Sequence, residues 1–533
     1  MKKGNVILIA LYDLDSFAVR TLHAVLKEAG FNVNSIFFKL LNPNNTMDPP
    51  SSNEINCLIK LIKELEPNLI GISVRSTLFK LASKITKEIK RELNASVIWG
   101  GVHPTIRPYQ CLEFADIVCI GEGEGAIAEL ATQLLKGGQI DNIQNLWIKK
   151  ENKIIRNNLR PLIQDLDLMP FPDFSNESKY LVENGNVLLL PGPDKKTTYC
   201  IMTSRGCPFN CTYCSNNVLR RIYEDKGKYV RRRTVENVIE ELVQAKKRFK
   251  NLASIGFGDD VFTFNIDWIR RFCDQYKKAV NLPFFCYCHP KTTNEEMIQL
   301  LKDAGVFCMT MGIQTGSKEF RHKYFERYDT NEEIVRSAEI LHKYKIDCAY
   351  DVIMDNPLET NENRWETFNL LLKLPKPFDL HTHTLTHFPE TKFTNLLLEK
   401  GIISENDIED QKQESYERWT PSLDLRRNKE NLFWDNLYYL AKRKYVPRGF
   451  VIWLSHIDFL KKHPKPLTLL LRLTSTSIFT VSSKIGMIRW YLMTLFWNPR
   501  LLFKKRAWLF LWTKIKEKLR LISDPKTYVQ KIK

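Results

Sequence analysis

Short apolar runs alternate with amphipathic stretches along most of this chain, and this alternation limits the fold more than any other feature of the sequence. In the first 140 residues, segments with helical periodicity separate the apolar runs of strand length. Successive β-then-α units predict an α/β fold with a parallel, doubly wound sheet and helices on both of its faces. The expected strands cover residues 5–11, 31–38, 68–74, 96–99 and 117–120.

The alternation stops after residue 140 and resumes near residue 199. The stretch between has little periodicity and a Pro-rich run at 165–173, which predicts an extended linker. Six further β/α units predict a full or partial (β/α) barrel, with its chemistry at the carboxyl ends of the strands. Their expected strands cover residues 199–203, 252–257, 284–287, 307–311, 347–353 and 381–387. The predicted divisions are a first domain at 1–140, a linker at 141–195, a core at 196–400 and a mostly helical, basic region at 401–533.

Composition places the chain among ordinary globular proteins, with 44% hydrophobic and 26% charged residues, and excludes fibrous and wholly disordered classes. No run of 18 uncharged apolar residues is present, so a conventional membrane-spanning helix is not expected. The apolar start is followed at once by Asp13 and Asp15, which favours a first β-strand over a signal peptide. Twelve cysteines without a secretion signal indicate a reducing cytoplasm rather than a disulfide scaffold.

The excess of positive over negative charge comes from one end of the sequence. Residues 441–533 hold 21 Lys and Arg against three acidic side chains, which accounts for the whole net charge of +18. Five tryptophans lie in the same segment, and basic residues beside aromatic anchors are typical of helices lying in a membrane interface. We therefore expect peripheral contact with the inner membrane face, while a covered helical cap is the alternative. A nucleic-acid partner is less favoured, because the segment is rich in Leu, Phe and Trp.

Glycines gather at two predicted strand ends of the first domain. Gly100 and Gly101 follow the fourth expected strand, and Gly121 and Gly123 follow the fifth. Ligands of doubly wound sheets bind beyond the carboxyl ends of the strands, and glycine lets a ligand approach the backbone closely. These positions predict a binding site, with ordinary tight turns as the alternative.

Three cysteines carry the strongest chemical signal. Cys207, Cys211 and Cys214 are spaced Cys-x3-Cys-x2-Cys directly after the first expected barrel strand. Thiolates suit iron–sulfur clusters, whereas structural zinc requires a fourth ligand that no nearby Cys or His supplies. Three thiolates would leave one iron of a 4Fe–4S cluster free to bind a substrate or cosubstrate.

This motif resembles that of the radical S-adenosylmethionine superfamily, and Tyr213 before the last cysteine fits the resemblance. The superfamily holds S-adenosylmethionine near the ends of later strands, where this chain has Gly258-Asp259-Asp260 and a Gly-Ile-Gln-Thr-Gly segment. The residues that the resemblance assigns to S-adenosylmethionine are Tyr213, Gly258, Asp259, Asp260, Gln314 and Gly316. Leu358 departs from the family's Pro-Gly-Glu-Thr turn, which puts the local backbone conformation in doubt.

The first domain is similar to the cobalamin-binding domain that precedes many radical S-adenosylmethionine cores. The residues that this resemblance assigns to cobalamin are Ser73, Gly100, Gly101, His103, Gly121, Glu122 and Gly123. The chain has no Asp-x-His-x-x-Gly motif, so the resemblance implies cobalamin without a protein histidine on cobalt. His103 is assigned to the corrin edge or to a turn, and His23 is expected on a helix surface. A domain that binds nothing is the alternative.

The resemblance implies an anaerobic enzyme in which the reduced cluster cleaves S-adenosylmethionine and methylcobalamin methylates an unactivated carbon. A small or lipid-like molecule is the expected substrate, and a flavodoxin or ferredoxin is the expected reductant. Radical cyclisation or oxidation of the magnesium-protoporphyrin ester cyclase type is one alternative, and a non-catalytic cobalamin or redox sensor is another.

Two further groups of residues each allow two interpretations. Strand alternation places His381 and His383 on one face, either toward a substrate or as ordinary core or surface histidines. Cys286, Cys288 and Cys308 lie near barrel strands, where core packing is favoured over a second cluster.

Overall fold

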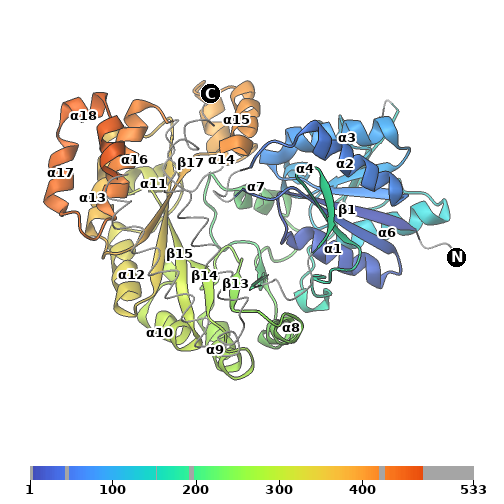
Figure 1. Cartoon of the computed structure of the whole chain (residues 1–533), viewed down its shortest axis with the longest axis horizontal. Helices are drawn as coiled ribbons and strands as arrows, with labels where there is room; N and C mark the ends of the chain where they lie inside the picture. Colours follow the sequence, from blue (N-terminus) through green and yellow to red (C-terminus); the bar gives the residue numbers. More distant parts are fainter. Residues whose placement is uncertain (1–3, 43–46, 152, 191–196, 419–426, 472–533) are drawn as a thin grey trace.

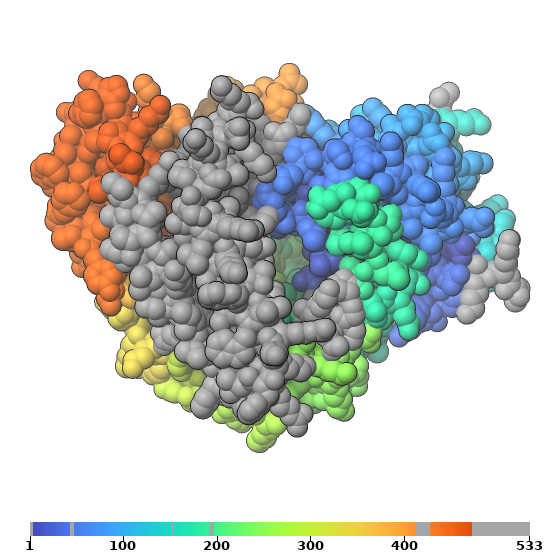
Figure 2. Space-filling view, in the orientation of Figure 1, coloured from blue at the N-terminus to red at the C-terminus, as the bar shows by residue number. Residues whose placement is uncertain are grey.

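The structure is a computed structural model, and it describes residues 4–42, 47–151, 153–190, 197–418 and 427–471. Two α/β units lie beside each other, with the N-terminal unit in blue and the second unit in green to yellow (Figure 1). Residues 427–462, in orange-red, lie on the side of the second unit that faces away from the N-terminal unit in both Figure 1 and Figure 2.

The N-terminal unit is built on a nine-stranded sheet, and its centre is parallel as the sequence predicts. Successive residues of β1 serve two cores, because side chains alternate across a strand. Ile7, Ile9 and Leu11 face α2 and α3, whereas Val6 and Leu8 face α1 and α6. The parallel strands are β1 (Asn5–Leu11), β2 (Asn32–Phe38), β3 (Leu69–Ser73), β4 (Ser96–Gly100) and β5 (Ile117–Cys119). The helices are α1 (Phe17–Glu28), α2 (Ser52–Glu64), α3 (Phe79–Glu92) and α6 (Glu124–Lys136).

The segment expected to be a bare linker adds four strands to this sheet, which differs from the sequence interpretation. β6 (Leu146–Lys150) and β7 (Lys153–Arg156) extend one edge, and β8 (Lys179–Glu183) and β9 (Asn186–Leu189) extend the other. The strands are short, and every residue of β9 is exposed, so the alternation of buried and exposed side chains is weak. The boundary at residue 140 stays a prediction.

The second unit holds a six-stranded parallel sheet whose strands follow one another in chain order, which confirms the predicted partial barrel. Its strands are β10 (Thr198–Ile201), β13 (Ser254–Phe257), β14 (Phe284–Cys288), β15 (Val306–Gln314), β16 (Asp347–Met354) and β17 (Asp379–Thr384). Its outer helices are α8 (Val235–Arg248), α9 (Ile266–Ala279), α10 (Glu295–Ala304), α12 (Asn331–Lys343) and α13 (Asn361–Lys373). Each of these five helices begins after a Thr or Asn whose side chain accepts a hydrogen bond from the first turn.

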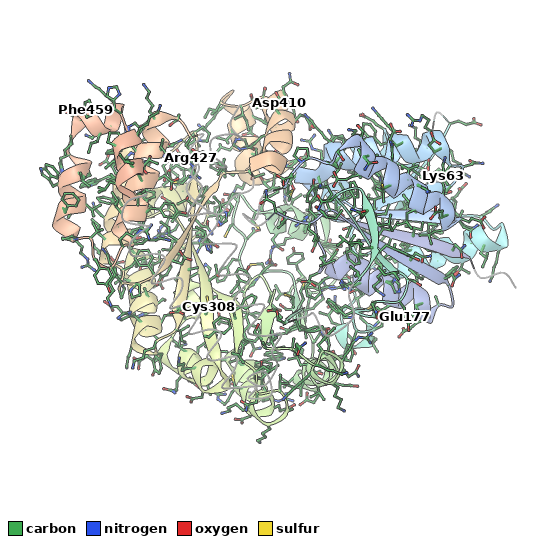
Figure 3. All side chains as sticks on the ribbon, in the orientation of Figure 1. Lys63, Glu177, Cys308, Asp410, Arg427 and Phe459 are labelled. Atoms are coloured by element: carbon green, nitrogen blue, oxygen red, sulfur yellow. The ribbon has the colours of Figure 1, made fainter. Side chains whose placement is uncertain are left out.

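The C-terminal region is helical where it is described. α16 (Lys429–Ala441), α17 (Arg448–Ser455) and α18 (Asp458–Lys462) pack together, and α16 also packs on α13. Figure 3 shows Arg427 next to this group and Cys308 within the second sheet. In the described ranges, no helix is both long enough and apolar enough to cross a membrane. Residues 472–533, which carry most of the predicted membrane segment, lie outside the described residues.

One helix connects the two units. α15 (Glu405–Arg418) follows α14 (Lys392–Glu399) and packs against α3 of the N-terminal unit. Arg107 pairs with Glu405 at 3.2 Å, and Gln110 Nε2 donates to Glu409 Oε1 at 3.0 Å. These contacts fix how the N-terminal unit sits on the second unit.

Candidate functional site: a cysteine loop and an inter-domain cavity

The three motif cysteines lie in one loop between β11 (Ser204–Arg205) and α7 (Ser215–Ile222), and Cys214 caps that helix. All three side chains are half-buried. Burial, together with the neighbouring Cys211 and Cys214, raises the pKa of Cys207 to about 12. Thiols in such surroundings ionise when a metal supplies positive charge.

The sulfur atoms of the three cysteines are not gathered as the ligands of a single zinc ion would be. Sulfurs bound to one tetrahedral Zn²⁺ would lie about 3.8 Å apart, given Zn–S bonds of about 2.3 Å. In the described part of the chain, the three cysteine sulfurs do not all lie within 4.8 Å of one another.

Asp259 holds the entrance of this loop in place. Its carboxylate accepts hydrogen bonds from the Thr203 amide at 3.0 Å and the Thr203 hydroxyl at 2.8 Å, and from the Ser204 hydroxyl. The side chain is fully buried. Asp259, which the resemblance assigns to S-adenosylmethionine, thus has a positioning role that the sequence did not reveal.

Gly258 and Asp260 follow β13, the same strand that Asp259 follows. Asn216 donates to Asp260 at 3.1 Å and accepts from the Tyr229 hydroxyl at 2.5 Å. Burial raises the pKa of Asp260, and its charge in turn raises the pKa values of Cys207 and Cys214. A Cβ placed on Gly258 would make only ordinary contacts, the nearest at 3.7 Å from the Ile201 carbonyl oxygen, so the backbone conformation does not require glycine there.

Arg327 brings a buried positive charge to the cysteine loop. It donates to the Gly312 carbonyl at 2.8 Å, to Asp329 at 3.1 Å and to the Tyr213 hydroxyl at 3.5 Å. The charge of Arg327 lowers the pKa of the Cys211 thiol, although burial raises that pKa overall. Sequence reasoning missed Arg327, and its only signal was the Arg-x-Asp spacing with Asp329.

His289 contacts both Arg327 and the cysteine loop. Its ring stacks on Phe209 of the cysteine loop with centroids 3.7 Å apart, and its Nε2 lies 3.1 Å from Arg327 Nη2. Burial and the charge of Arg327 lower the pKa of His289 to about 3, so the ring is neutral and accepts the hydrogen bond. Sequence reasoning had no basis for selecting this histidine.

The Gly-Ile-Gln-Thr-Gly segment ends β15. Gln314 has a positive φ of 69°. A Cβ on Gly312 would lie only 2.4 Å from Gln314 Nε2. A Cβ on Gly316 would lie 2.4 Å from Thr367 Cα, and the Gly316 amide donates to the Thr367 hydroxyl at 2.7 Å. Gly316 therefore allows the strand end to pack on α13, which is a structural role.

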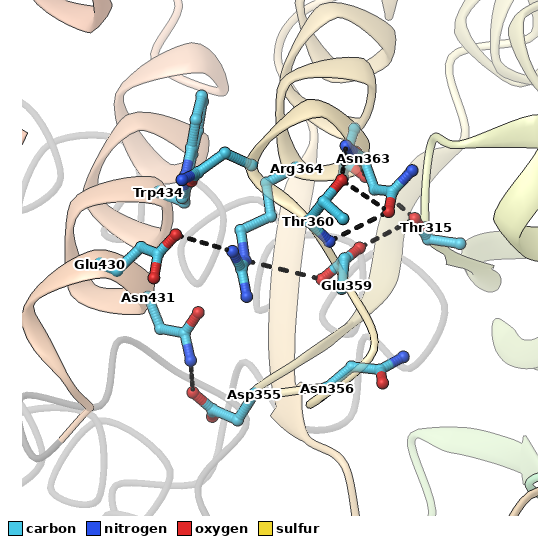
Figure 4. Close-up of polar contacts among 12 residues, drawn as sticks. Thr315, Asp355, Asn356, Glu359, Thr360, Asn363, Arg364, Glu430, Asn431 and Trp434 are labelled. Carbon is cyan, nitrogen blue, oxygen red and sulfur yellow. Dashed lines mark hydrogen bonds and ion pairs between the residues drawn. The ribbon is translucent and has the colours of Figure 1, made fainter. Parts of the chain in front are cut away.

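The turn after β16 carries a buried carboxyl group (Figure 4). Glu359 accepts a hydrogen bond from the Thr315 hydroxyl at 3.1 Å and lies 3.9 Å from Arg364. Burial raises the pKa of Glu359 to about 7. Leu358 does not have a positive φ, whereas Asp355 does at 59°, so the missing glycine does not strain this turn.

A cavity of about 510 Å³ lies between the two units. Its walls come from both strand-end glycine turns of the first unit and from the cysteine-loop side of the second. The predicted residues that line it are Ser73, Gly100, Gly101, Gly121, Glu122, Gly123 and Asp260. Ser204, Arg205, Gly206, Asn216 and Tyr229 complete the polar wall on the second unit.

The glycines suit a large, flat ligand. Gly101 has a φ of +110°, and a Cβ there would lie 2.9 Å from the Val74 carbonyl. Gly100 and Gly123 also line the cavity, and a Cβ on either would make only an ordinary contact with Cys119, at 3.8 Å and 3.4 Å. The residues present therefore fit a cobalamin lying against the first sheet.

Glu122, which lines the cavity, also forms ion pairs between the two units. Its carboxylate pairs with Arg205 at 3.0 Å and Arg231 at 2.9 Å, and it accepts from the Ile163 amide at 2.9 Å. Neighbouring Glu124 also pairs with Arg205, at 2.5 Å. Glu122 thus fastens the two units beside the cavity.

Neither histidine of the first unit reaches the cavity. His103 is fully buried, lies 3.1 Å from the Ser76 hydroxyl and packs on Phe79. His23 was expected on the surface, which is wrong: its side chain is buried and lies 2.9 Å from the Ser35 hydroxyl. No described residue lining the cavity is a histidine.

Comparisons with known proteins agree with this geometry. The B12 binding domain matches residues 6–131, and the Radical SAM superfamily matches residues 201–371. An uncharacterized methyltransferase of Pyrococcus horikoshii is 28% identical over 360 residues, covering 65% of this chain and 72% of the relative. The cytidylyl-2-hydroxyethylphosphonate methyltransferase of Streptomyces wedmorensis is 23% identical over 295 residues, covering 49% of this chain and 52% of the relative.

Two solved structures share the fold. The radical S-adenosylmethionine methyltransferase TsrM from Kitasatospora setae aligns with a TM-score of 0.60 and 20% identity, over 75% of this chain and 76% of that one. The cobalamin-dependent S-adenosylmethionine radical enzyme OxsB aligns with a TM-score of 0.61 and 16% identity, over 97% of this chain and 81% of that one. The cofactors of the two domain types are a 4Fe–4S cluster with S-adenosylmethionine, and cobalamin. The chain therefore carries a B12-binding domain at residues 6–131, ahead of a radical SAM domain at residues 201–371.

Proposed function

We propose that this enzyme methylates an unactivated carbon of a small or lipid-like molecule, using cobalamin and a cluster-bound S-adenosylmethionine. One observation supports the proposal most directly: the inter-domain cavity is lined on one side by the glycine turns and on the other by Asp260 and Asn216. Both residues adjoin the cysteine loop, because the Asn216 amide lies 3.8 Å from Cys214 Sγ. The two cofactor sites therefore open onto a shared space.

The cofactors would supply reductive cleavage of S-adenosylmethionine and the methyl group. Within this proposal, Cys207, Cys211 and Cys214 hold the cluster, and Arg327 offsets part of their negative charge. Tyr213, Gly258, Asp260 and Gln314 would contact S-adenosylmethionine, as the resemblance implies, and Asp260 lines the cavity.

The chain also controls access of water to the shared space. Met169, Pro170, Phe171 and Pro172 of the segment between the units line the cavity on its apolar side. Glu122 and Arg205 hold the two walls together. A dry, fixed space keeps reactive species away from solvent, which is the contribution a protein makes to cofactor-borne radical chemistry.

Cyclisation is the second candidate, because an anaerobic magnesium-protoporphyrin IX monomethyl ester cyclase of Cereibacter sphaeroides is 24% identical over 341 residues. This chain spans only 50% of that relative. The two reactions differ in product mass, since methyl transfer adds a CH₂ unit to the substrate whereas ring closure removes hydrogen.

The test is anaerobic reconstitution with both cofactors and a reductant such as flavodoxin or ferredoxin, followed by mass spectrometry of small-molecule and lipid extracts. We expect a product heavier by one CH₂ unit, formed with S-adenosylmethionine cleavage. The variants Cys207→Ala, Cys211→Ala and Cys214→Ala should lose the cluster and the cleavage, while Cys57→Ala, remote from the loop, should keep both. Cleavage that persists in the triple variant would contradict the ligand assignment, and a hydrogen-depleted product would favour the cyclase.

A further inference from the structure

Two histidines and an aspartate meet on the inner face of the second sheet, on β16 and β17, the last two strands of the sheet whose first strand, β10, precedes the cysteine loop. Asp351 lies on β16 directly opposite His381 on β17, and His383 follows two residues later. The neighbouring residues Tyr350 and Leu380 point the other way, into the core beneath the outer helices. The three polar side chains therefore share the concave face.

The ligand atoms of this group are close enough to share one ion. His381 Nδ1 lies 2.9 Å from Asp351 Oδ1, and His383 Nε2 lies 3.7 Å from the same oxygen. One ligand atom from each residue can be chosen so that all lie within 4.8 Å of one another. Ligands of a tetrahedral Zn²⁺ would lie about 3.3 Å apart, given bonds of about 2.0–2.1 Å, and the two measured separations fall on either side of this value.

We propose that Asp351, His381 and His383 bind one divalent transition-metal ion, such as Zn²⁺ or Fe²⁺, at a site separate from the iron–sulfur cluster. Imidazole nitrogen suits zinc and iron, and two histidines with one carboxylate form a facial ligand set that leaves further positions open. Adjacent strands hold the three side chains on a rigid support, which favours a defined geometry.

The surroundings of the site favour an exchangeable ligand over a closed structural site. The side chains of Asp351, His381 and His383 remain 22%, 30% and 34% exposed, so an ion and a small ligand can reach them. The nearby carboxylate of Asp379 is paired with Lys442 at 2.5 Å. The Asp351 carboxylate would then be the one anionic ligand of the ion. The bound ion would keep a positive charge and could polarise an oxygen of a molecule bound on the concave face.

Both imidazoles face the same carboxylate oxygen. One imidazole at 2.9 Å already satisfies an oxygen of Asp351, yet a second imidazole stands beside the same oxygen at 3.7 Å, beyond normal hydrogen-bond length. A metal ion would bring both rings into use. The proposal rests on this geometry and does not depend on the methyl transfer proposed above.

The test measures binding of Co²⁺ alone to the full chain, with Cys207, Cys211 and Cys214 replaced by Ala so that neither a cluster nor these three thiolates compete. Isothermal titration calorimetry gives the stoichiometry, and the visible absorption of bound Co²⁺ reports its coordination. We expect one ion per chain. His381→Gln, His383→Gln and Asp351→Asn, each added to this background, should each weaken binding by at least tenfold.

His342→Ala is the matched control, because His342 is an exposed histidine on α12 of the same unit, and it should leave binding unchanged. Circular dichroism and thermal unfolding verify that each variant is folded. Failure of the folded parent to bind Co²⁺, or equal affinity in all variants, would overturn the proposal. Neither result would affect cleavage of S-adenosylmethionine by the protein with its cysteines intact, so the two proposals can fail separately.

Discussion

Arg205, two residues before the first motif cysteine, forms an ion pair with Glu122 of the glycine turn at 3.0 Å. The contact joins the cysteine loop of one domain to the cofactor-facing turn of the other. Arg231 pairs with the same carboxylate at 2.9 Å and is itself buried, so the charges depend on each other. Removal of the Glu122 carboxylate would leave the guanidinium groups of Arg205 and Arg231 without this counter-charge.

We therefore predict that Glu122→Gln destabilises the protein by about 1–3 kcal/mol, because two guanidinium groups lose their carboxylate in a partly buried place. Urea unfolding followed by circular dichroism measures the change. Glu64→Gln is the control, since Glu64 pairs with Lys60 on an exposed helix face, and it should shift stability by no more than about 0.5 kcal/mol. Equal effects of the two variants would show that the inter-domain ion pairs stabilise the protein no more than an exposed ion pair does.

Glu359 predicts a dependence of stability on pH. Its pKa in the folded chain is raised from 4.5 to about 7 by burial, so the folded state favours the protonated form. The stability that this carboxyl contributes is fully present below pH 4.5 and is lost as the pH rises toward 7, because the unfolded chain releases the proton first.

Glu359→Gln removes this titration and keeps an oxygen that can accept from Thr315. Relative to wild type, the variant should gain about 2–3 kcal/mol of unfolding free energy between pH 5 and pH 8. Denaturant titrations of both proteins at the two pH values provide the comparison. A difference between the proteins that stays constant with pH would show that Glu359 does not titrate in this range.

The absence of histidine from the described cavity lining leads to a spectroscopic prediction. When loaded with cobalamin in its cob(II) form, the protein should give an electron paramagnetic resonance spectrum without nitrogen superhyperfine splitting from a lower axial ligand. His103→Ala should give the same spectrum, because His103 is buried against Ser76 and Phe79. Clear nitrogen coupling that His103→Ala abolishes would contradict the prediction, and failure to take up cobalamin would contradict the site itself.

The predicted membrane contact needs a truncation chosen from the structure. Residues 441–471 include Val451, Leu454 and Leu460, which are buried in the core, so removing them would damage the fold. Residues 472–533 still carry 14 Lys and Arg against two acidic side chains and four tryptophans. Each basic residue near an anionic leaflet contributes about 1 kcal/mol, and apolar burial adds to this.

We expect the full chain to float with vesicles of mixed phosphatidylcholine and phosphatidylserine, and a chain ending at Leu471 to remain at the bottom of the gradient. Vesicles of phosphatidylcholine alone are the control for charge. Flotation of both chains, or of neither, would remove 472–533 as the membrane-binding segment.

The parallel strands were predictable because a buried strand must be apolar along its whole length, and five such runs appear between residues 5 and 120. The edge strands β6 to β9 were not, since a strand exposed on one side has no uniform apolar signal. Tertiary pairing with β2 and β5, rather than local sequence, makes these segments extended.

The cysteine loop was predictable from spacing alone, because three ligands within eight residues form a local motif. Arg327 and His289 were not, because they come from distant segments that only the folded chain brings to Tyr213 and Phe209. Asp259 shows a third situation: its position was recognised, but its bonds to Thr203 and Ser204 required the structure.

The contacts of α15 with the first domain have a kinetic consequence. Glu405 and Glu409 tie this helix to Arg107 and Gln110, while Glu122 ties the opposite side of the interface to Arg205. These contacts hold the two walls of the cavity at a set separation. Because a corrinoid has to pass between these walls, weakening one of the attachments should speed cobalamin uptake.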